Sequence, residues 1–449
     1  MTDRRHFLLL LLAIVTCMVT HAQQLLSLDS CRALALRHNK QMLIARQQQQ
    51  ATHYEQRAAF TNFLPKISAS GTYMHTEREL SLLNEEQKEL LGVLSEWLRT
   101  DTRNLWIGNI QLTQPLYMGG KIAAYYRITR YKAHIADKQT EAKRQETLSA
   151  IDEAYWLVVS LAAKKELAQN YLQLTRTLEN DIQKMVDAGI ATRADKLSII
   201  VKSDKAALTL TEVTDGLNLS RMALCQLCGL PLESDIRLID EEISRNENGK
   251  KDDDSFIPSI LAQDVNMALT QNPELQSLRY LHKIRQQQVK ITRADYLPTV
   301  VLTGGYMTSN PSLMNGFERK FNGTWFVGAI ASVPLWNWGE GIYKVREARA
   351  QANISHYELT EAEELVELQV HQAYYRTNEA QKRLEMTKQN VMKATENLRY
   401  AQVGFQEGVI PVNNVMEAQT AWLSAHTEQV DAFIEVKLAY ANLQKVIGK

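Results

Sequence analysis

Two cysteines at the end of a long helical pattern have a spacing that suggests chemistry. Cys225 and Cys228 form a Cys-x-x-Cys pair, which occurs in redox and metal sites. A redox pair usually opens a helix after a strand, whereas this pair closes a helical pattern. Because residues three apart share a helix face, we interpret both cysteines as small residues of a packed seam. Cys17 belongs to the export signal predicted below, so the mature chain has Cys31, Cys225 and Cys228, an odd number of thiols that argues against a disulfide framework.

No other set of residues in the sequence has the spacing of an active site. Gly119-Gly120-Lys121 lacks the upstream glycine of a phosphate-binding loop, because Pro115 occupies that position. Neither the His-Glu-x-x-His pattern of zinc proteases nor the Gly-x-Ser-x-Gly turn of hydrolases occurs, and the 10 histidines are scattered. We therefore expect no enzyme, no cofactor and no metal site.

Composition restricts the class of protein and its partners. The 449 residues are too many for one typical domain and fit two or three. Because 51 Lys and Arg balance 51 Asp and Glu, the charge gives no reason to expect nucleic acid as a partner. After the first residues, no segment reaches the 18 apolar residues of a transmembrane helix. An exported soluble protein and a membrane protein built from strands both remain open.

The first residues predict an export signal. Arg4 and Arg5 precede the apolar run from Phe7 to Val19, which is too short to span a bilayer comfortably. Small residues around Ala22 fit cleavage by a signal peptidase, so residues 1–22 are expected to be a signal peptide.

The rest of the chain is a tandem duplication. The stretches NFLPKISASGTYM and DYLPTVVLTGGYM share Leu-Pro, Gly and Tyr-Met at equal spacing, which pairs Pro65 with Pro298. Farther along, the copies align without a gap from Pro115 and Pro334 onward. We expect a first repeat over 23–230, a linker over 231–261 and a second repeat over 262–449.

Each repeat opens with a helical stretch, 29–59 or 262–294, and continues with two strands. Residues from Ile67 to Tyr73 alternate between an apolar or small face and a Ser or Thr face, which is typical of strands. About ten residues suffice for a tilted strand to cross a bilayer. Strands are expected at about 64–76, 104–117, 297–309 and 322–336. Their landmarks, with aromatic residues at the expected membrane interface, are Pro65, Tyr73, Trp106, Pro115, Pro298, Tyr306, Trp325 and Pro334.

Two helices follow the strands in each repeat. The first contains no proline and is long enough to extend roughly 100 Å. A heptad-like seam that includes Leu178 and Ile182 indicates a coiled coil with the helix that returns after a glycine turn. The expected helices are 121–187, 194–228, 340–406 and 413–447.

Four membrane strands are too few for a closed barrel, because the smallest single-chain barrels have eight. Open strand edges in lipid leave backbone groups unpaired, so a chain of this kind must oligomerise. The alternative is an exported coiled-coil scaffold or stalk with no transport role. That alternative leaves the apolar strand faces and their aromatic ends unexplained.

The combination of these features resembles the outer-membrane efflux protein family, which is TolC-like. The resemblance rests on the export signal, the paired Leu-Pro strands, the stretch from Pro115 to Gly120 before a long helix, and the glycine turns. The resemblance implies a mainly α-helical chain with a membrane β-barrel portion. It implies a homotrimer with a twelve-stranded β-barrel and a periplasmic α-helical barrel, located in the outer membrane.

The resemblance also implies a function and partners. It predicts a passive duct of a tripartite efflux or type I secretion system. The partners would be a periplasmic adaptor protein, an inner-membrane pump of the RND, ABC or MFS type, and outer membrane lipid. In the family, the glycine turns form a tip that closes like an iris and meets the adaptor. The matching residues here are Gly189, Ile190, Gly408 and Val409.

Gate and selectivity residues follow from the same match. Asp195 falls where the family has its gate aspartate, whereas Phe405 and Ile410 replace the usual tyrosine and arginine. We therefore expect apolar packing of Phe405 and Ile410 to replace the polar closure. The family's carboxylate rings fall on Asn414 and Glu417, of which only Glu417 is acidic. Three copies of Glu417 around a bore would favour cations. The alternative is that Asp195 and Glu417 are surface charges at helix ends.

Overall fold

The chain folds into two compact units. The computed structural model describes residues 24–77, 85–93, 103–241, 261–312 and 318–448, so the expected signal peptide lies outside the described residues. Unit 1 comprises residues 1–47, 138–276 and 361–449, and unit 2 comprises residues 48–137 and 277–360. The helices α6 (Lys121–Asp187) and α10 (Glu340–Gln406) contribute residues to both units.

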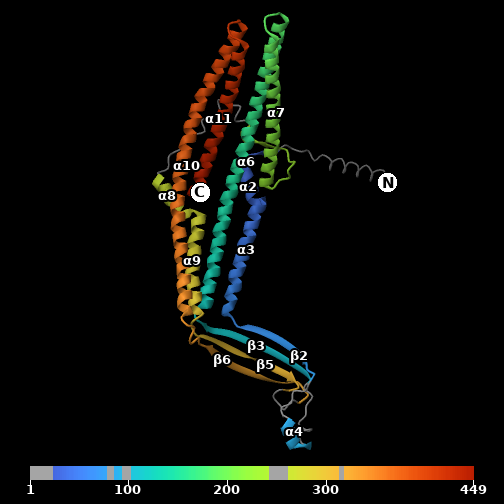
Figure 1. Cartoon of the computed structure of the whole chain (residues 1–449), viewed down its shortest axis with the longest axis vertical. Coiled ribbons are helices and arrows are strands. Elements are labelled where there is room, and N and C mark those ends of the chain that lie inside the picture. The colour runs from blue at the N-terminus through green and yellow to red at the C-terminus, as the bar shows by residue number, and fades with distance from the viewer. Residues whose placement is uncertain (1–23, 78–84, 94–102, 242–260, 313–317, 449) are drawn as a thin grey trace, which may run out of the picture. The chain divides into compact units, whose positions relative to one another are not determined.

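Unit 2 contains an antiparallel sheet in the order β2-β3-β5-β6 (Figure 1). Its strands are β2 (Lys66–His75), β3 (Asn104–Met118), β5 (Thr299–Asn310) and β6 (Asn322–Ser332). Each repeat supplies one hairpin, and the two hairpins join through β3 and β5. The edges of this sheet are therefore β2 from the first repeat and β6 from the second.

The register places the apolar faces of all four strands on the same side of the sheet. Ile110 lies opposite both Ala69 and Tyr306, and Tyr306 lies opposite Trp325. Directly opposed residues of an antiparallel pair share a face. On the other face Gln111 Nε2 donates a hydrogen bond of 3.0 Å to Thr303 Oγ1. The sheet is thus two-sided, with one apolar and one polar face.

Prolines interrupt the pairing at two places. β3 continues through Pro115, but its register with β5 shifts between Pro115 and Tyr117, which marks a bulge. The prediction of a strand over 322–336 was wrong at its end, because β6 stops at Ser332. Pro334 has no N–H to donate, and the chain leaves the sheet before it.

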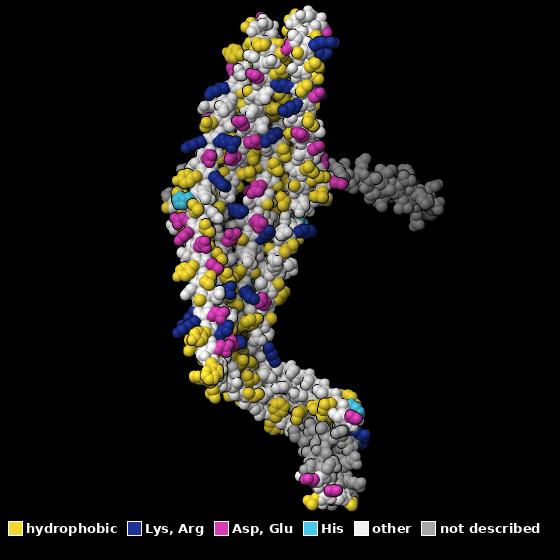
Figure 2. Space-filling model, viewed as in Figure 1, with side chains coloured by type: hydrophobic (Ala, Val, Ile, Leu, Met, Phe, Trp, Pro, Cys, Tyr) yellow, Lys and Arg dark blue, Asp and Glu magenta, His cyan; other side chains and the backbone are white. Residues whose placement is uncertain are grey.

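The sheet carries almost no charge. Lys66 is the only Lys, Arg, Asp or Glu in the four strands. In the view of Figure 2, charged side chains are spread over the helices, while the strands show mainly hydrophobic and neutral side chains. Exposed side chains of the sheet include Ile67, Tyr73, Trp106, Ile110, Tyr306, Trp325, Val327 and Ile330. A sheet with this surface suits lipid better than water.

The helical stretch that opens each repeat is two helices rather than one. Asn39 separates α2 (Leu28–His38) from α3 (Lys40–Phe60), and Asn272 separates α8 (Leu261–Gln271) from α9 (Pro273–Ala294). Each asparagine ends one helix and caps the next, because its Oδ1 atom accepts a backbone N–H at 2.9 Å. Between β2 and β3, a short helix α4 (Glu85–Leu91) occurs.

Unit 1 is built around two helical hairpins, whose turns lie at the same end of the unit (Figure 1). α6 is followed by α7 (Arg193–Cys228), and α10 is followed by α11 (Val412–Ile447). The predicted seam is buried, with Leu178 and Ile182 exposing 6% and 1% of their surface. Within the described ranges, no helix is both long and apolar enough to cross a membrane.

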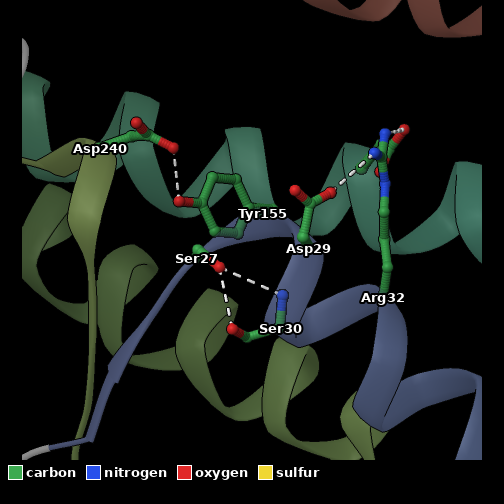
Figure 3. A network of polar contacts seen from close by, with 7 residues as sticks. Ser27, Asp29, Ser30, Arg32, Tyr155 and Asp240 are labelled. Atoms are coloured by element: carbon green, nitrogen blue, oxygen red, sulfur yellow. Dashed lines mark hydrogen bonds and ion pairs between the residues drawn. The ribbon is translucent and has the colours of Figure 1, made fainter.

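Among the described residues of unit 1, the largest cluster of buried side chains joins the amino-terminal segment to α6 and α7. β1 (Gln24–Leu26) pairs in parallel with β4 (Ile236–Leu238), so the expected linker over 231–261 begins with ordered structure. Figure 3 shows Tyr155 of α6 donating a hydrogen bond of 2.5 Å to Asp240. Burial and this carboxylate raise the pKa of the Tyr155 hydroxyl, so it stays a donor.

Candidate functional site

The two glycine turns close the hairpins with the same backbone geometry. Gly189 and Gly408 have φ angles of 74° and 72°, in the left-handed region that other residues rarely adopt. The next residue then bonds back into the last helical turn. Ile190 N donates to Met185 O, and Val409 N donates to Gly404 O, both at 2.8 Å. This C-terminal cap explains why a glycine recurs at this point in both repeats.

Each glycine turn presents an apolar side chain to solvent. Ile190 is 73% exposed and Val409 is 79% exposed. These two residues occupy equivalent positions in the two repeats. An exposed apolar residue held by a rigid turn is a suitable anchor for a protein partner, because its contact surface needs no reordering.

Asp195 is held in a capping box at the start of α7. Asp195 N donates to Thr192 Oγ1 at 3.2 Å, and Thr192 N donates to Asp195 Oδ2 at 3.1 Å. The bond from the Thr192 hydroxyl lowers the pKa of this carboxyl below its ordinary value. At the equivalent turn Pro411 is the cap residue and makes no such side-chain bond, and Asn414 is exposed. Within the chain, Asp195 therefore has a local structural role.

Below the turns, four helices share one apolar cluster. Its buried members come from α6, α7, α10 and α11: Leu178, Ile182, Ile199, Leu398, Ala401, Val412, Val415 and Ala418. Phe405 is half-buried against this cluster. Ile410 instead lies over Gly404, where an added Cβ would come within 2.5 Å of Ile410 Cδ1. Both predicted apolar gate residues thus pack against their own subunit.

A groove of about 570 Å³ runs between α7 and α11 close to the turns. Its lining is Ser198, Lys202, Asn413, Met416, Glu417, Thr420, Ala421 and Ser424. Glu417 is thus the only predicted selectivity residue in the groove. The duplication aligns Glu417 with Ser198 and Lys202 with Ala421, so each helix brings one charged residue of opposite sign.

Lys202 is a charged residue of this groove that sequence reasoning did not single out. Its ammonium group donates hydrogen bonds to the Met416 carbonyl oxygen and, at 2.8 Å, to Thr420 Oγ1. Burial lowers the pKa of Lys202, while the nearby Glu417 carboxylate acts against that shift. No local pattern marks this lysine, because its partners are more than two hundred residues away in the chain.

Comparison with known proteins identifies this architecture. The model of a family described as "Outer membrane efflux protein" matches residues 32–230 and 265–449. The chain belongs to the outer membrane efflux protein family. The two matched segments include both hairpins with their glycine turns and all four strands of the sheet. The resemblance inferred from the sequence is therefore confirmed.

Individual relatives of this efflux protein agree with that assignment. The alkaline protease secretion protein AprF of Pseudomonas aeruginosa is 25% identical over 349 residues, which cover 76% of this chain and 69% of AprF. The outer membrane protein TolC of Escherichia coli is 21% identical over 353 residues, covering 70% of each chain. Among solved structures, the CmeC outer membrane channel of Campylobacter jejuni has a TM-score of 0.76 at 16% identity, covering 94% of this chain and 85% of CmeC.

The family assignment places the efflux protein in the outer membrane as a channel subunit, with its long helices in the periplasm. The known members are channel proteins. The exposed apolar face of the sheet fits this location, and so do strands with a single charged residue.

Proposed function

We propose that three copies of this efflux protein form a passive export duct. An inner-membrane pump of the RND, ABC or MFS type delivers cargo to the duct through a periplasmic adaptor. The observation that carries the trimer is the open sheet, whose edge strands β2 and β6 have no partner among the described strands. In lipid each unpaired backbone group costs several kcal/mol, so edges must meet edges. Three chains of four strands supply the twelve strands of the family's barrel.

The mass of the protein extracted from the outer-membrane fraction in mild detergent tests this proposal. We expect three protomers in one detergent micelle, with ion conductance after insertion into a planar bilayer. A monomer in the soluble periplasmic fraction would instead favour a scaffold without a transport role.

The exposed turns are proposed to contact the adaptor through Ile190 and Val409. Replacing Val409 with aspartate places a charge at the centre of an apolar contact, so we expect adaptor binding to weaken about 30-fold or more. Photo-crosslinking from position 190 in living cells, in wild type and in each variant, provides the measurement, and mass spectrometry identifies the product. Leu90→Asp is the matched control, because Leu90 is 89% exposed and belongs to α4, not to a tip turn. Equal crosslinking by the two variants would argue against tip docking.

The resting duct is proposed to close through apolar contacts of Phe405 and Ile410 rather than through polar ones. Support comes from the capping box, which already uses the Asp195 carboxylate within its own turn. We expect Ile410→Ala to raise the single-channel conductance of the resting channel. Ile190→Ala also shortens an apolar side chain at a tip turn, and it should leave conductance unchanged without adaptor. Identical conductance for Ile410→Ala and wild type would remove Ile410 from the gate.

Ion selectivity is proposed to depend on both charges of the α7–α11 groove. In a trimeric bore, Glu417→Gln removes three negative charges and should lower the cation-to-anion permeability ratio about two- to tenfold. Lys202→Gln removes three positive charges and should shift the ratio in the opposite direction. Reversal potentials in a salt gradient measure both effects, and low salt enlarges them because screening weakens. A ratio unmoved by either variant would place both side chains outside the conducting path.

A further inference from the structure

Three thiols, one of them almost two hundred residues before the other two, lie together in the largest buried cluster among the described residues of unit 1. Cys31 of α2 and Cys225 of α7 are both 0% exposed, and Cys228 at the end of α7 is 1% exposed. All three are present as free thiols in the structure. Among the residues that the structure describes, no group of three or more His, Cys, Asp or Glu is arranged to hold a metal ion.

The end of α7 packs closely against the end of α2, beside Cys228. A Cβ added to Gly229 would come within 2.6 Å of His38 Cβ and 3.0 Å of His38 O. Asn39 Nδ2, just after α2, donates to Leu227 O at 2.9 Å. Both contacts flank Cys228, so the end of α7 is fixed against α2. A disulfide between two helices requires that they pack closely, because the Cα atoms of its cysteines are usually about 4.4–6.8 Å apart.

Cys31 and Cys228 face each other directly. The Cys228 thiol donates a hydrogen bond to the carbonyl oxygen of Cys31, with Sγ 3.8 Å from that oxygen. In the folded chain the neighbouring Cys228 thiol lowers the pKa of Cys31. Cys225 differs, because its Sγ is directed to Ser234 O at 3.9 Å and burial raises its pKa.

We propose that Cys31 and Cys228 are a disulfide site of the exported efflux protein and that Cys225 remains a free thiol. The outer-membrane location supplies the setting, since the chain crosses the periplasm, where disulfides form and persist. Because both sulfurs are buried in the folded unit, the bond forms during folding, before α2 has fully docked on α7.

The chemistry requires an oxidant of the thiol–disulfide oxidoreductase class. The Cys31 thiolate attacks one sulfur of the oxidant's disulfide, which forms a mixed disulfide and releases one oxidant thiolate. The Cys228 thiolate then attacks Cys31 Sγ, forms the intramolecular bond and displaces the second oxidant thiolate. The two protein thiols lose two protons and two electrons, and the oxidant disulfide is reduced to a dithiol.

The proposed bond would tie the amino-terminal segment to the end of the first helical hairpin. It joins residues 197 positions apart, and a closed loop of that length strongly restricts the unfolded chain. The bond would also hold α2 in place beside β1, whose pairing with β4 has only three residues on each strand.

Thiol counting on protein purified from the outer-membrane fraction tests the proposal. Thiols are blocked with an alkylating reagent during lysis and again after denaturation without reductant, and peptides are then mapped by mass spectrometry. We expect alkylation at Cys225 only, together with a peptide pair linked through Cys31 and Cys228. Alkylation of all three cysteines in wild-type protein would overturn the proposal, as would a link between Cys225 and Cys228.

Cysteine variants distinguish the proposed Cys31–Cys228 disulfide from one between Cys225 and Cys228. Cys225→Ser should keep the linked peptides and the faster migration of unreduced protein on denaturing gels. Cys31→Ser should lose both, and reductant should lower the unfolding temperature of wild type but not of Cys31→Ser. If Cys31→Ser fails to fold, the wild-type thiol count still decides the question. Conductance of the same preparation tests the duct separately, because a conducting protein with three free thiols would overturn only the disulfide.

Discussion

Replacing Gly305 with alanine is expected to break the pairing of β3 with β5 and to remove most of the protein from the outer membrane. An added Cβ would overlap the carbonyl oxygen of Ile110 and lie 3.2 Å from the Cα atom of Gln111. Both are backbone atoms of the paired strand, so they cannot move aside by rotating a side chain. Overpacking of this kind costs about 1–3 kcal/mol or more, and broken ladder bonds in lipid add to it.

The same sheet offers a matched control in Gly328 of β6. No atom lies within 4 Å of a Cβ built at Gly328, so Gly328→Ala changes the backbone entropy without a clash. The measurement is the amount of trimer recovered from the outer-membrane fraction after equal expression. We expect a near-normal amount for Gly328→Ala and a severe loss for Gly305→Ala. Similar recovery of the two variants would contradict the close backbone approach at Gly305.

Replacing Arg32 with glutamine should destabilise unit 1 by about 1–2 kcal/mol, because it leaves a buried carboxylate without its partner, while the 36% exposure of Arg32 lets solvent screen part of the loss. Arg32 Nε and Nη2 each donate to a different oxygen of Asp152 at 2.7 Å. The side chain of Asp152 is only 6% exposed. The bond to Asp152 raises the pKa of Arg32, so the guanidinium remains charged. The denaturant midpoint of the circular dichroism signal in detergent measures the loss.

Two further variants distinguish this effect from a general loss of charge. Arg144→Gln breaks an exposed pair with Glu141 on one helix, and pairs of that kind contribute about 0.5 kcal/mol or less. The double variant Arg32→Gln with Asp152→Asn removes the buried charge and should regain part of the lost stability. A midpoint for Arg32→Gln equal to that of Arg144→Gln would show that Asp152 does not depend on Arg32.

Local patterns in the sequence are sufficient to locate the elements of this fold. Strands follow from period-two alternation, as in the stretch from Ile67 to Tyr73, because successive side chains of a strand face opposite sides. The long helices follow from proline-free stretches that end at Gly189 and Gly408, whose positive φ angles close the turns. The end of β6 was misjudged, because periodicity continued past Ser332 while Pro334 ended the hydrogen-bonded ladder.

The candidate site was only partly visible in the sequence. Glu417 lines the groove between α7 and α11, and its cationic neighbour Lys202 was not predicted from the sequence. Asp195 has a capping partner in Thr192, three residues away, which is a local signal that the sequence does contain. The gate, ring and tip roles remain predictions that the proposed variants test.

The sequence by itself therefore determined the duplicated elements, the apolar strand faces and the family, because these depend on residues close together in the chain. Only the tertiary structure decided which distant side chains meet. Arg32 pairs with Asp152, Cys31 faces Cys228, and Lys202 contacts Met416 across separations of 120, 197 and 214 residues. Helical periodicity specifies which face of a helix is buried, but not which residue of another helix lies opposite. That choice is made by the packing of complete hairpins against one another.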